Sequence, residues 1–209
     1  MYKLYYHSGA CSMGPHVVLN ELNVPFEAIK IDLQKGEGQK PEFLKLNPRG
    51  QIPLLIDEDG TAIREGAAII IYLCEKHNSP LLPKSGKERA AALSWLMWCN
   101  ASLHPAFART FWINRNVKDE KQKAELLKIA REQIQSFWDE ADKRLAETPY
   151  LAGKTLTPAD ILMTMIANWA DPGTYKYGKN VMRVIKEVSA RPAYQKALKT
   201  EQVEYKAAA

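Results

Sequence analysis

The chain has 209 residues, and 29 Lys and Arg against 24 Asp and Glu give it a formal charge of +5. Charged residues make up 25% and hydrophobic residues 46%, which excludes a disordered tail, a collagen and a disulfide-rich miniprotein. A chain of this length can form one or two domains with a sizeable core. The basic residues are scattered among acidic ones, so we expect solvated helix faces and no nucleic-acid binding.

The three cysteines are an odd number and cannot all pair within one chain. The first residues lack a signal-peptide pattern, and no stretch approaches the roughly 20 apolar residues of a membrane span. We therefore expect a cytoplasmic protein without a membrane segment, in which thiols stay reduced. Cys74 and Cys99 lie in apolar helical stretches and are expected in the core, which leaves Cys11 as the candidate for chemistry.

The first 80 residues alternate between strand and helix patterns. Apolar residues at positions 15, 18, 19 and 22 have the spacing of an amphipathic helix, and Asp59-Gly60 between two apolar runs indicates a hairpin. The predicted order is β-α-β-(α)-β-β-α. Its strands are expected at Lys3–Tyr6, Phe26–Leu33, Ile52–Ile56 and Thr61–Arg64, and its last, buried helix at Ala67–Cys74.

The stretch from Asn78 to Gly86 contains two prolines and is predicted to be a linker. Beyond it only helical patterns occur. Helices are expected over Arg89–Phe111, with a kink at Pro105, and over Ala124–Leu145 and Ile161–Trp169. Val181–Leu198 is expected to form one or two more helices. We therefore predict an α/β domain at residues 1–79 and an all-α helical bundle domain at residues 87–209.

The segment Thr157-Pro158-Ala159-Asp160 predicts the start of a buried helix. Thr157 can be the N-cap, and Pro158 occupies the first helical position, where its missing N–H costs nothing. Asp160 can reach back to the cap and complete a capping box. Because the helix that follows is apolar on nearly every side, we expect it in the middle of the helical bundle.

Cys11 lies in the loop between the first strand and the first helix. The unpaired N–H groups and the positive dipole at the start of a helix favour a thiolate, so this position predicts a lowered pKa. No second cysteine follows two residues later, which excludes a dithiol mechanism within the loop. The alternative is a small buried residue that fills the loop.

Two further positions are candidates for ligand binding. Pro53 stands at the entry of a strand; if its peptide bond is cis, the backbone of Ile52 becomes a bare strand edge that can pair with an extended peptide. An ordinary trans edge proline is the alternative. Glu65 and Gly66 directly precede an apolar helix, where the N–H groups can bind a carboxylate and Glu65 an ammonium group. The alternative is a carboxylate that only stabilises the helix dipole.

These features occur in one order along the chain: Cys11, then Gln51-Ile52-Pro53, then Glu65-Gly66. Together with the segments 5–16, 47–53 and 156–161, this constellation resembles the cytosolic glutathione S-transferases over nearly the whole chain. The cysteine loop is similar to that of the bacterial beta-class members. The resemblance implies an α/β thioredoxin-like N-terminal domain, an all-α C-terminal helical bundle domain and assembly as a homodimer.

The resemblance also implies a cytoplasmic glutathione transferase of detoxification, with glutathione as co-substrate and no metal. Such an enzyme transfers the glutathione thiol to a hydrophobic electrophile or reduces disulfides, and some members have peroxidase activity. Cys11 would be the catalytic thiol. The glutathione-binding residues implied are Cys11, Lys35, Gln51, Ile52, Pro53, Glu65 and Gly66.

The helical domain contributes His104, which matches an active-site histidine of the beta class. Aromatic content and helix position place the electrophile pocket near Phe107, Phe111, Trp112 and Trp169, with core packing as the alternative for at least half of them. Met97 and Ser102 depart from the beta-class pattern, where an asparagine and a glutamate are expected.

Two rival functions remain open at this point. Ser12 directly follows Cys11 and could stabilise the glutathione thiolate in a Ser12-type transferase or isomerase. Alternatively, the same fold could be a non-catalytic ligand- or partner-binding protein, which the departures at Met97 and Ser102 would favour.

Overall fold

The computed structural model describes residues 1–208, and the chain forms two compact units. The first unit combines Met1–Lys84 with Ser189–Tyr205, and the second combines Ser85–Val188 with the chain from Lys206 onward. The boundary between Lys84 and Ser85 lies within the linker predicted from the sequence, but the sequence pattern assigns all residues after the linker to the helical domain. The structure differs there, because residues 189–205 pack with the first unit.

A mixed four-stranded sheet with the order β2-β1-β3-β4 forms the centre of the first unit. Its strands are β1 (Tyr2–Tyr6), β2 (Phe26–Lys30), β3 (Leu54–Ile56) and β4 (Ala62–Arg64). β1 is parallel to β2 and antiparallel to β3, and β3 and β4 form the predicted hairpin. β1 is therefore a central strand, and the loop that carries Cys11 follows its C-terminal end.

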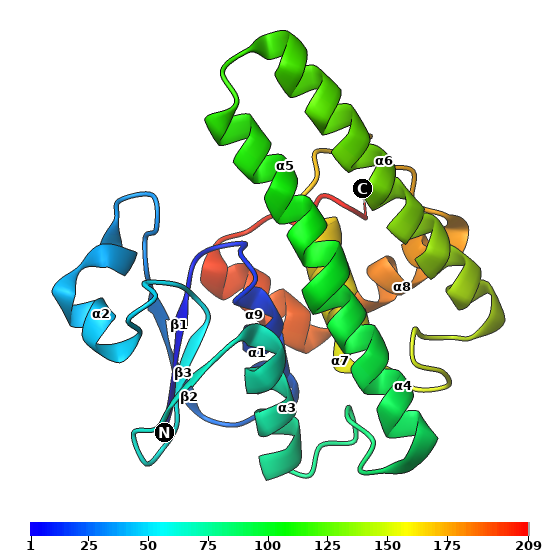
Figure 1. Ribbon diagram of the computed structural model, residues 1–209. Helices are drawn as coiled ribbons and strands as arrows, with labels where there is room; N and C mark the ends of the chain where they lie inside the picture. The colour runs from blue at the N-terminus through cyan, green and yellow to red at the C-terminus, as the bar shows by residue number, and fades with distance from the viewer. Residues whose placement is uncertain (209) are drawn as a thin grey trace. The chain divides into compact units, whose positions relative to one another are not determined.

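Helices cover both faces of this sheet (Figure 1). They are α1 (Met13–Glu21), a 3₁₀ turn at Glu37–Gln39, α2 (Pro41–Leu46) and α3 (Gly66–Lys76). Phe43 of α2 packs with Leu54 and Tyr5 on one face. Alternate residues of β1, Tyr2, Leu4 and Tyr6, are buried on the other, where α1 and α3 pack together.

The last helix, α9 (Pro192–Glu201), belongs to the first unit because it packs along α1. Arg191 forms a two-point ion pair with Glu21, at 2.6 and 2.8 Å. Asn20 donates a hydrogen bond to the Ala193 carbonyl at 3.2 Å. Pro192 is the first residue of α9, and it separates this helix from the preceding one. The predicted helical region of residues 181–198 therefore consists of two helices, and the second of them packs on α1.

The second unit consists of helices. They are α4 (Gly86–Met97), a π-helical turn at Trp98–Leu103, α5 (His104–Asn116), α6 (Glu120–Glu147), α7 (Pro158–Ala167) and α8 (Lys179–Ser189). α5 and α6 lie side by side (Figure 1). The irregularity predicted at Pro105 occurs in the turn before it, because the ring and the missing N–H disturb the preceding helical hydrogen bonds.

The predicted capping box and the buried helix are confirmed. All ten residues of α7 are buried. The Asp160 carboxylate accepts hydrogen bonds from the Thr157 N–H and hydroxyl, both at 2.9 Å, and from the Leu151 N–H at 2.8 Å. Burial raises the pKa of Asp160 to about 6, so these three donors stabilise an ionised carboxylate at neutral pH. None of the helices described in residues 1–208 has the length and apolar composition that a bilayer crossing needs.

Replacement of Asp160 by Asn tests how much this capping box contributes to the free energy of unfolding. The amide nitrogen cannot accept the hydrogen bonds that one carboxylate oxygen accepts, so buried donors lose their partner. We expect Asp160→Asn to lower the free energy of unfolding by about 2 to 3 kcal/mol. The measurement is the urea midpoint with an unchanged m-value. The exposed Asp171→Asn is the control, and a loss below about 0.5 kcal/mol for Asp160→Asn would contradict the assignment.

Candidate functional site

Cys11 lies in the turn that joins β1 to α1. The turn is closed by two backbone hydrogen bonds, from Ala10 to the His7 carbonyl at 3.1 Å and from Met13 to the Ala10 carbonyl at 3.0 Å. The Cys11 thiol donates to the carbonyl oxygen of Ile52, with 3.6 Å between sulfur and oxygen. Residues 41 positions apart in the chain, Cys11 and Ile52, are therefore brought together as the sequence predicts.

The pKa of Cys11 differs from the sequence-based expectation. Burial raises it to about 11, and the negative charges of Glu65 and Glu201 add to this effect. The N–H groups of Cys11 and Ser12 act in the opposite direction but are outweighed. The prediction of a lowered pKa is therefore wrong for this structure, because desolvation exceeds the stabilisation that the start of the helix provides. This raised pKa favours the neutral thiol at pH 7 in the ligand-free protein.

The Ile52–Pro53 peptide bond is cis, the arrangement that the sequence leaves open. Ile52 lies just before β3, and its carbonyl accepts the Cys11 thiol. Among the backbone hydrogen bonds of turns, loops and helix caps in residues 1–208, none has the Ile52 N–H as its donor. The backbone of Ile52 is thus placed beside the thiol with a donor that an extended peptide can use.

The loop before Pro53 is held by the buried side chain of Asn47. Its amide donates to the Gln51 carbonyl at 2.6 Å, and its oxygen accepts from the backbone of Arg49 at 3.3 Å. The same oxygen accepts from the guanidinium of Arg64 at 3.1 Å, and Arg64 also donates to the Leu46 carbonyl at 2.8 Å. Sequence reasoning missed both positioning residues. The Asn-Pro-Arg-Gly run signals a turn, but it does not show that Arg64 of β4 stabilises it.

Glu65 and Gly66 occupy the start of α3, close to the thiol. Glu65 has a φ of +68°, a backbone conformation that residues other than glycine rarely adopt. Residues in such conformations are common at functional sites. A Cβ placed on Gly66 would lie 3.6 Å from Pro53 Cγ and 4.0 Å from the Cys11 carbonyl oxygen. No side chain caps this helix end. Cys11, Pro53 and Gly66 therefore meet at one place, as the resemblance implies.

The outer side of this site carries an ion pair. Arg49 Nη1 lies 2.7 Å from Glu65 Oε1, and the two side chains are 65% and 63% exposed. Gln51, which precedes Ile52, is also exposed. Lys35 is 80% exposed and lies 3.5 Å from the carboxylate of Asp32 in the loop after β2. The structure gives Lys35 no contact with the group around Cys11, so its predicted role in glutathione binding stays a prediction.

Ser12 is buried and engaged within its own loop. Its hydroxyl accepts a hydrogen bond from the His7 N–H at 3.1 Å and donates to the His7 carbonyl at 3.2 Å. This two-way contact closes the turn between β1 and α1. Because the hydroxyl proton is directed at His7, the geometry favours a structural role for Ser12 over thiolate stabilisation.

A buried carboxylate beneath the Cys11 loop was not foreseen from the sequence. Glu201 of α9 accepts from the Gly9 N–H at 2.9 Å and lies 2.8 Å from His16 Nδ1. Both side chains of the His16–Glu201 pair are almost completely buried. Nothing local signals the contact, because Glu201 is 192 residues from Gly9.

The aromatic residues predicted for the electrophile pocket have different environments in the second unit. Phe107 is only 2% exposed and packs against Trp138 and Trp169, so it belongs to the core. The ring centroids of His104 and Trp169 are 4.8 Å apart, and those of Trp169 and Phe111 are 6.2 Å apart. Core packing, the alternative left open for part of the set, therefore holds for Phe107.

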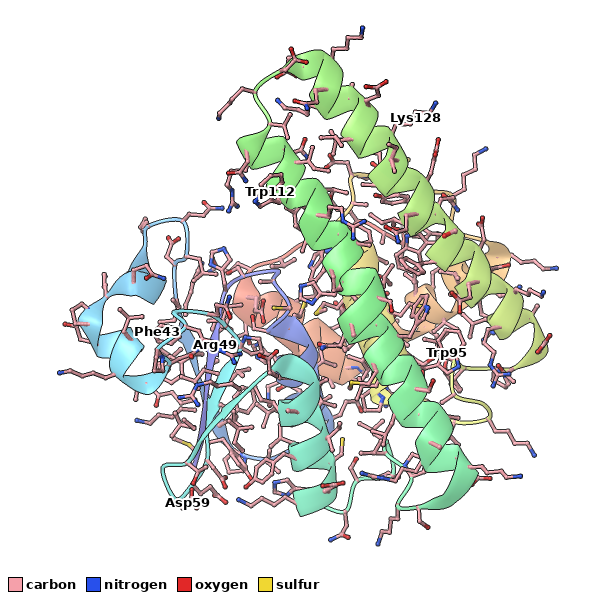
Figure 2. The ribbon with its side chains drawn as sticks, viewed as in Figure 1. Phe43, Arg49, Asp59, Trp95, Trp112 and Lys128 are labelled. Atoms are coloured by element: carbon pink, nitrogen blue, oxygen red, sulfur yellow. The ribbon has the colours of Figure 1, made fainter. Side chains whose placement is uncertain are left out.

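Phe111 and Trp112 are 43% and 61% exposed on α5, where Figure 2 labels Trp112. Met97, at the end of α4, is 38% exposed.

Cys74 and Cys99 are buried, as predicted, and the Cys99 thiol donates to the Ala159 carbonyl at 3.4 Å. Burial raises the pKa of Cys74 to about 12, so neither of these cysteines competes with Cys11 as the reactive thiol.

Comparisons with known proteins agree with the fold. Residues 9–76 match the profile of the glutathione S-transferase N-terminal domain, and residues 99–192 match that of the C-terminal domain. A glutathione S-transferase of Xanthomonas campestris is 32% identical over 172 residues, which cover 80% of this chain and 82% of the relative. A disulfide-bond oxidoreductase of Escherichia coli, YfcG, is 34% identical over 68% of each chain.

A solved structure with bound ligand is also similar. The glutathione S-transferase of a sphingomonad, complexed with glutathione, superimposes with a TM-score of 0.82 and 29% identity, over 97% of this chain and 100% of that one. The fold predicted from the resemblance, a thioredoxin-like N-terminal domain followed by a helical C-terminal domain, is confirmed. From its two matched domains and its relatives, the chain belongs to the glutathione S-transferase family.

Proposed function

We propose that this protein is a glutathione transferase that binds glutathione beside Cys11 and uses the glutathione thiol on electrophiles or disulfides. The observation that carries the proposal is the meeting of Cys11, the cis Ile52–Pro53 bond and the start of α3 at one place. The complex of the sphingomonad relative with glutathione supports it.

In the proposed complex the tripeptide lies along the edge formed by Ile52. The N–H of Ile52 would pair with the cysteinyl backbone, which brings the glutathione sulfur to Cys11. The γ-glutamyl end would reach Glu65, whose carboxylate can bind the ammonium group, and the N–H of Gly66 at the start of α3. Gln51 and Lys35 are proposed as further contacts, Lys35 with a carboxylate of the ligand.

The thiol of Cys11 has two distinct roles in the proposed reactions, and its raised pKa favours the first of them. In transfer, the neutral S–H donates a hydrogen bond to the glutathione thiolate, which attacks the electrophile and forms a thioether. In disulfide reduction, Cys11 loses its proton and attacks the glutathionyl sulfur of a mixed disulfide, which releases the other thiolate. A second glutathione thiolate then attacks the Cys11–glutathione disulfide, releasing glutathione disulfide and restoring the thiol.

Further properties are proposed on the resemblance rather than on contacts. They are beta-class-like chemistry, peroxidase activity, a role in detoxification, a cytoplasmic location and assembly as a homodimer. His104 is proposed as an active-site residue of the helical unit, with Phe111, Trp112 and Trp169 as contacts for a hydrophobic electrophile. Their partial exposure supports this, whereas the burial of Phe107 does not.

Two substitutions separate the proposed thiol role from the rival serine role. We expect Cys11→Ala to lower the rate of glutathione-dependent disulfide reduction at least about 100-fold, because the mixed disulfide cannot form. Ser12→Ala is the matched control and should change that rate less than about 5-fold at a temperature where it stays folded. Both variants are assayed on a disulfide and on an aryl halide. Full disulfide reduction by Cys11→Ala would exclude the proposed role of Cys11.

The role of Glu65 is tested through the affinity for glutathione. Glu65→Gln keeps the shape of the side chain but removes the charge, so the ammonium group loses a charge-assisted hydrogen bond. We expect KM for glutathione to rise about 10-fold, while kcat changes little. Glu58→Gln, an exposed carboxylate in the β3–β4 turn, is the control. An unchanged KM in Glu65→Gln would remove Glu65 from the site.

The pH dependence of alkylation checks the state of the Cys11 thiol. In the ligand-free protein the thiolate fraction rises only as the pH approaches about 11, so the rate with iodoacetamide should still increase between pH 9 and 10. A model peptide thiol levels off above its pKa of about 8.5. Cys11→Ala accounts for any reaction at Cys74 and Cys99. A rate that is already constant above pH 8 would contradict the raised pKa.

A further inference from the structure

Arg49 has no role in the residues assigned from the sequence, yet it lies at the mouth of the proposed glutathione site. It belongs to the loop between α2 and β3, which Asn47 holds through its amide and carbonyl groups. Figure 2 labels Arg49 on this loop, and its guanidinium reaches Glu65 at the start of α3, 2.7 Å away. The ion pair thus connects the two segments that flank the proposed γ-glutamyl position.

An exposed ion pair of this kind contributes little to stability, because water screens it and two long side chains must be ordered. Its chemistry is nevertheless specific. The α-amino acid end of a γ-glutamyl group carries an ammonium and a carboxylate on one carbon. A carboxylate and a guanidinium held side by side present the opposite charges at a similar spacing, so such an end group can exchange partners with the pair.

We propose that Arg49 binds the α-carboxylate of the γ-glutamyl group while Glu65 binds the adjacent ammonium. This inference rests on the proposed glutathione-binding function and adds a specificity-determining residue to it. A guanidinium is suited to the task because it presents five N–H donors in a planar fork that matches a carboxylate. The contact to Glu65 uses Nη1, and the remaining donors can face the ligand.

The neighbouring cations are less suited to this role. Arg64 donates from Nε to Asn47 and from Nη2 to the Leu46 carbonyl, so its guanidinium fixes the loop from within. Lys35 lies beside Asp32, in a different loop. Arg49 is therefore the cation that the structure places directly against Glu65.

A competing explanation makes the opposite prediction. If Arg49 only neutralises Glu65, a ligand ammonium must displace it, and removal of the guanidinium should strengthen glutathione binding. If Arg49 binds the carboxylate, its removal should weaken binding, and only for ligands that carry this group. The sign of the change in KM, and its dependence on the ligand carboxylate, decide between the two explanations.

The experiment compares Arg49→Gln and Arg49→Lys with the wild-type protein. Lys45→Gln is the control, because it removes one exposed positive charge from nearby α2. KM and kcat are measured with glutathione and with γ-aminobutyryl-cysteinylglycine, which lacks the α-carboxylate. We expect Arg49→Gln to raise KM for glutathione about 10-fold with kcat nearly unchanged, and to leave KM for the analogue within about 2-fold. Arg49→Lys should restore part of the affinity, and Lys45→Gln should behave as wild type.

Three results would overturn the inference: an unchanged KM in Arg49→Gln, a lower KM, or an equal rise for glutathione and the analogue. Direct titration of the wild-type protein with glutathione separates this failure from that of the proposed function. If the wild type binds glutathione and Arg49→Gln binds it equally well, only the role of Arg49 is wrong. If the wild type does not bind glutathione, both the proposed function and the role of Arg49 are rejected.

Discussion

The partly buried position of the Cys11 thiol is the constraint on which the chemistry of this protein depends. The turn between β1 and α1 places the Cys11 sulfur 3.6 Å from the Ile52 carbonyl oxygen, and the backbone carbonyl of Cys11 lies beside Gly66. The same packing that assembles the site withdraws water from the sulfur, and the pKa of Cys11 rises to about 11. A free thiolate is therefore disfavoured at neutral pH. Whatever activates this thiol must supply positive charge or hydrogen-bond donors that the ligand-free site lacks in sufficient number.

The charges around the thiol divide into a buried set and an exposed set. Glu201 is buried beneath the loop, where it fixes Gly9 and contacts His16, and its negative charge raises the pKa of Cys11. Glu65 also raises that pKa, but its carboxylate is exposed and paired with Arg49. A ligand ammonium bound by Glu65 would offset this second negative charge. Recognition of the γ-glutamyl end is then coupled to the ionisation of the thiol by simple electrostatics.

Local sequence signals predicted most of the fold, and the resemblance implied which positions meet at the site. The Asp59-Gly60 hairpin and the capping box of Thr157 and Asp160 depend on nearby residues, and both are present. The sign of the pKa shift at Cys11 was missed because burial comes from a segment 41 residues away. The same limit applies to Glu201, which stabilises the loop from the other end of the chain. Tertiary contacts of this range leave no periodic pattern in the sequence.

The partly buried thiol and the exposed ion pair are suited to different tasks within the first unit: the thiol to the reaction, and the ion pair to recognition of the ligand's end group. Arg49 and Glu65 sit in water, so contacts with them can discriminate between end groups but contribute modest binding energy each. Cys11 is partly buried, so a hydrogen bond from its S–H to a ligand sulfur is less screened by water than a contact at the exposed pair. A neutral thiol that donates to a glutathione thiolate therefore exploits the burial that opposes its own ionisation. Disulfide reduction needs the Cys11 thiolate, which the raised pKa disfavours in the ligand-free protein.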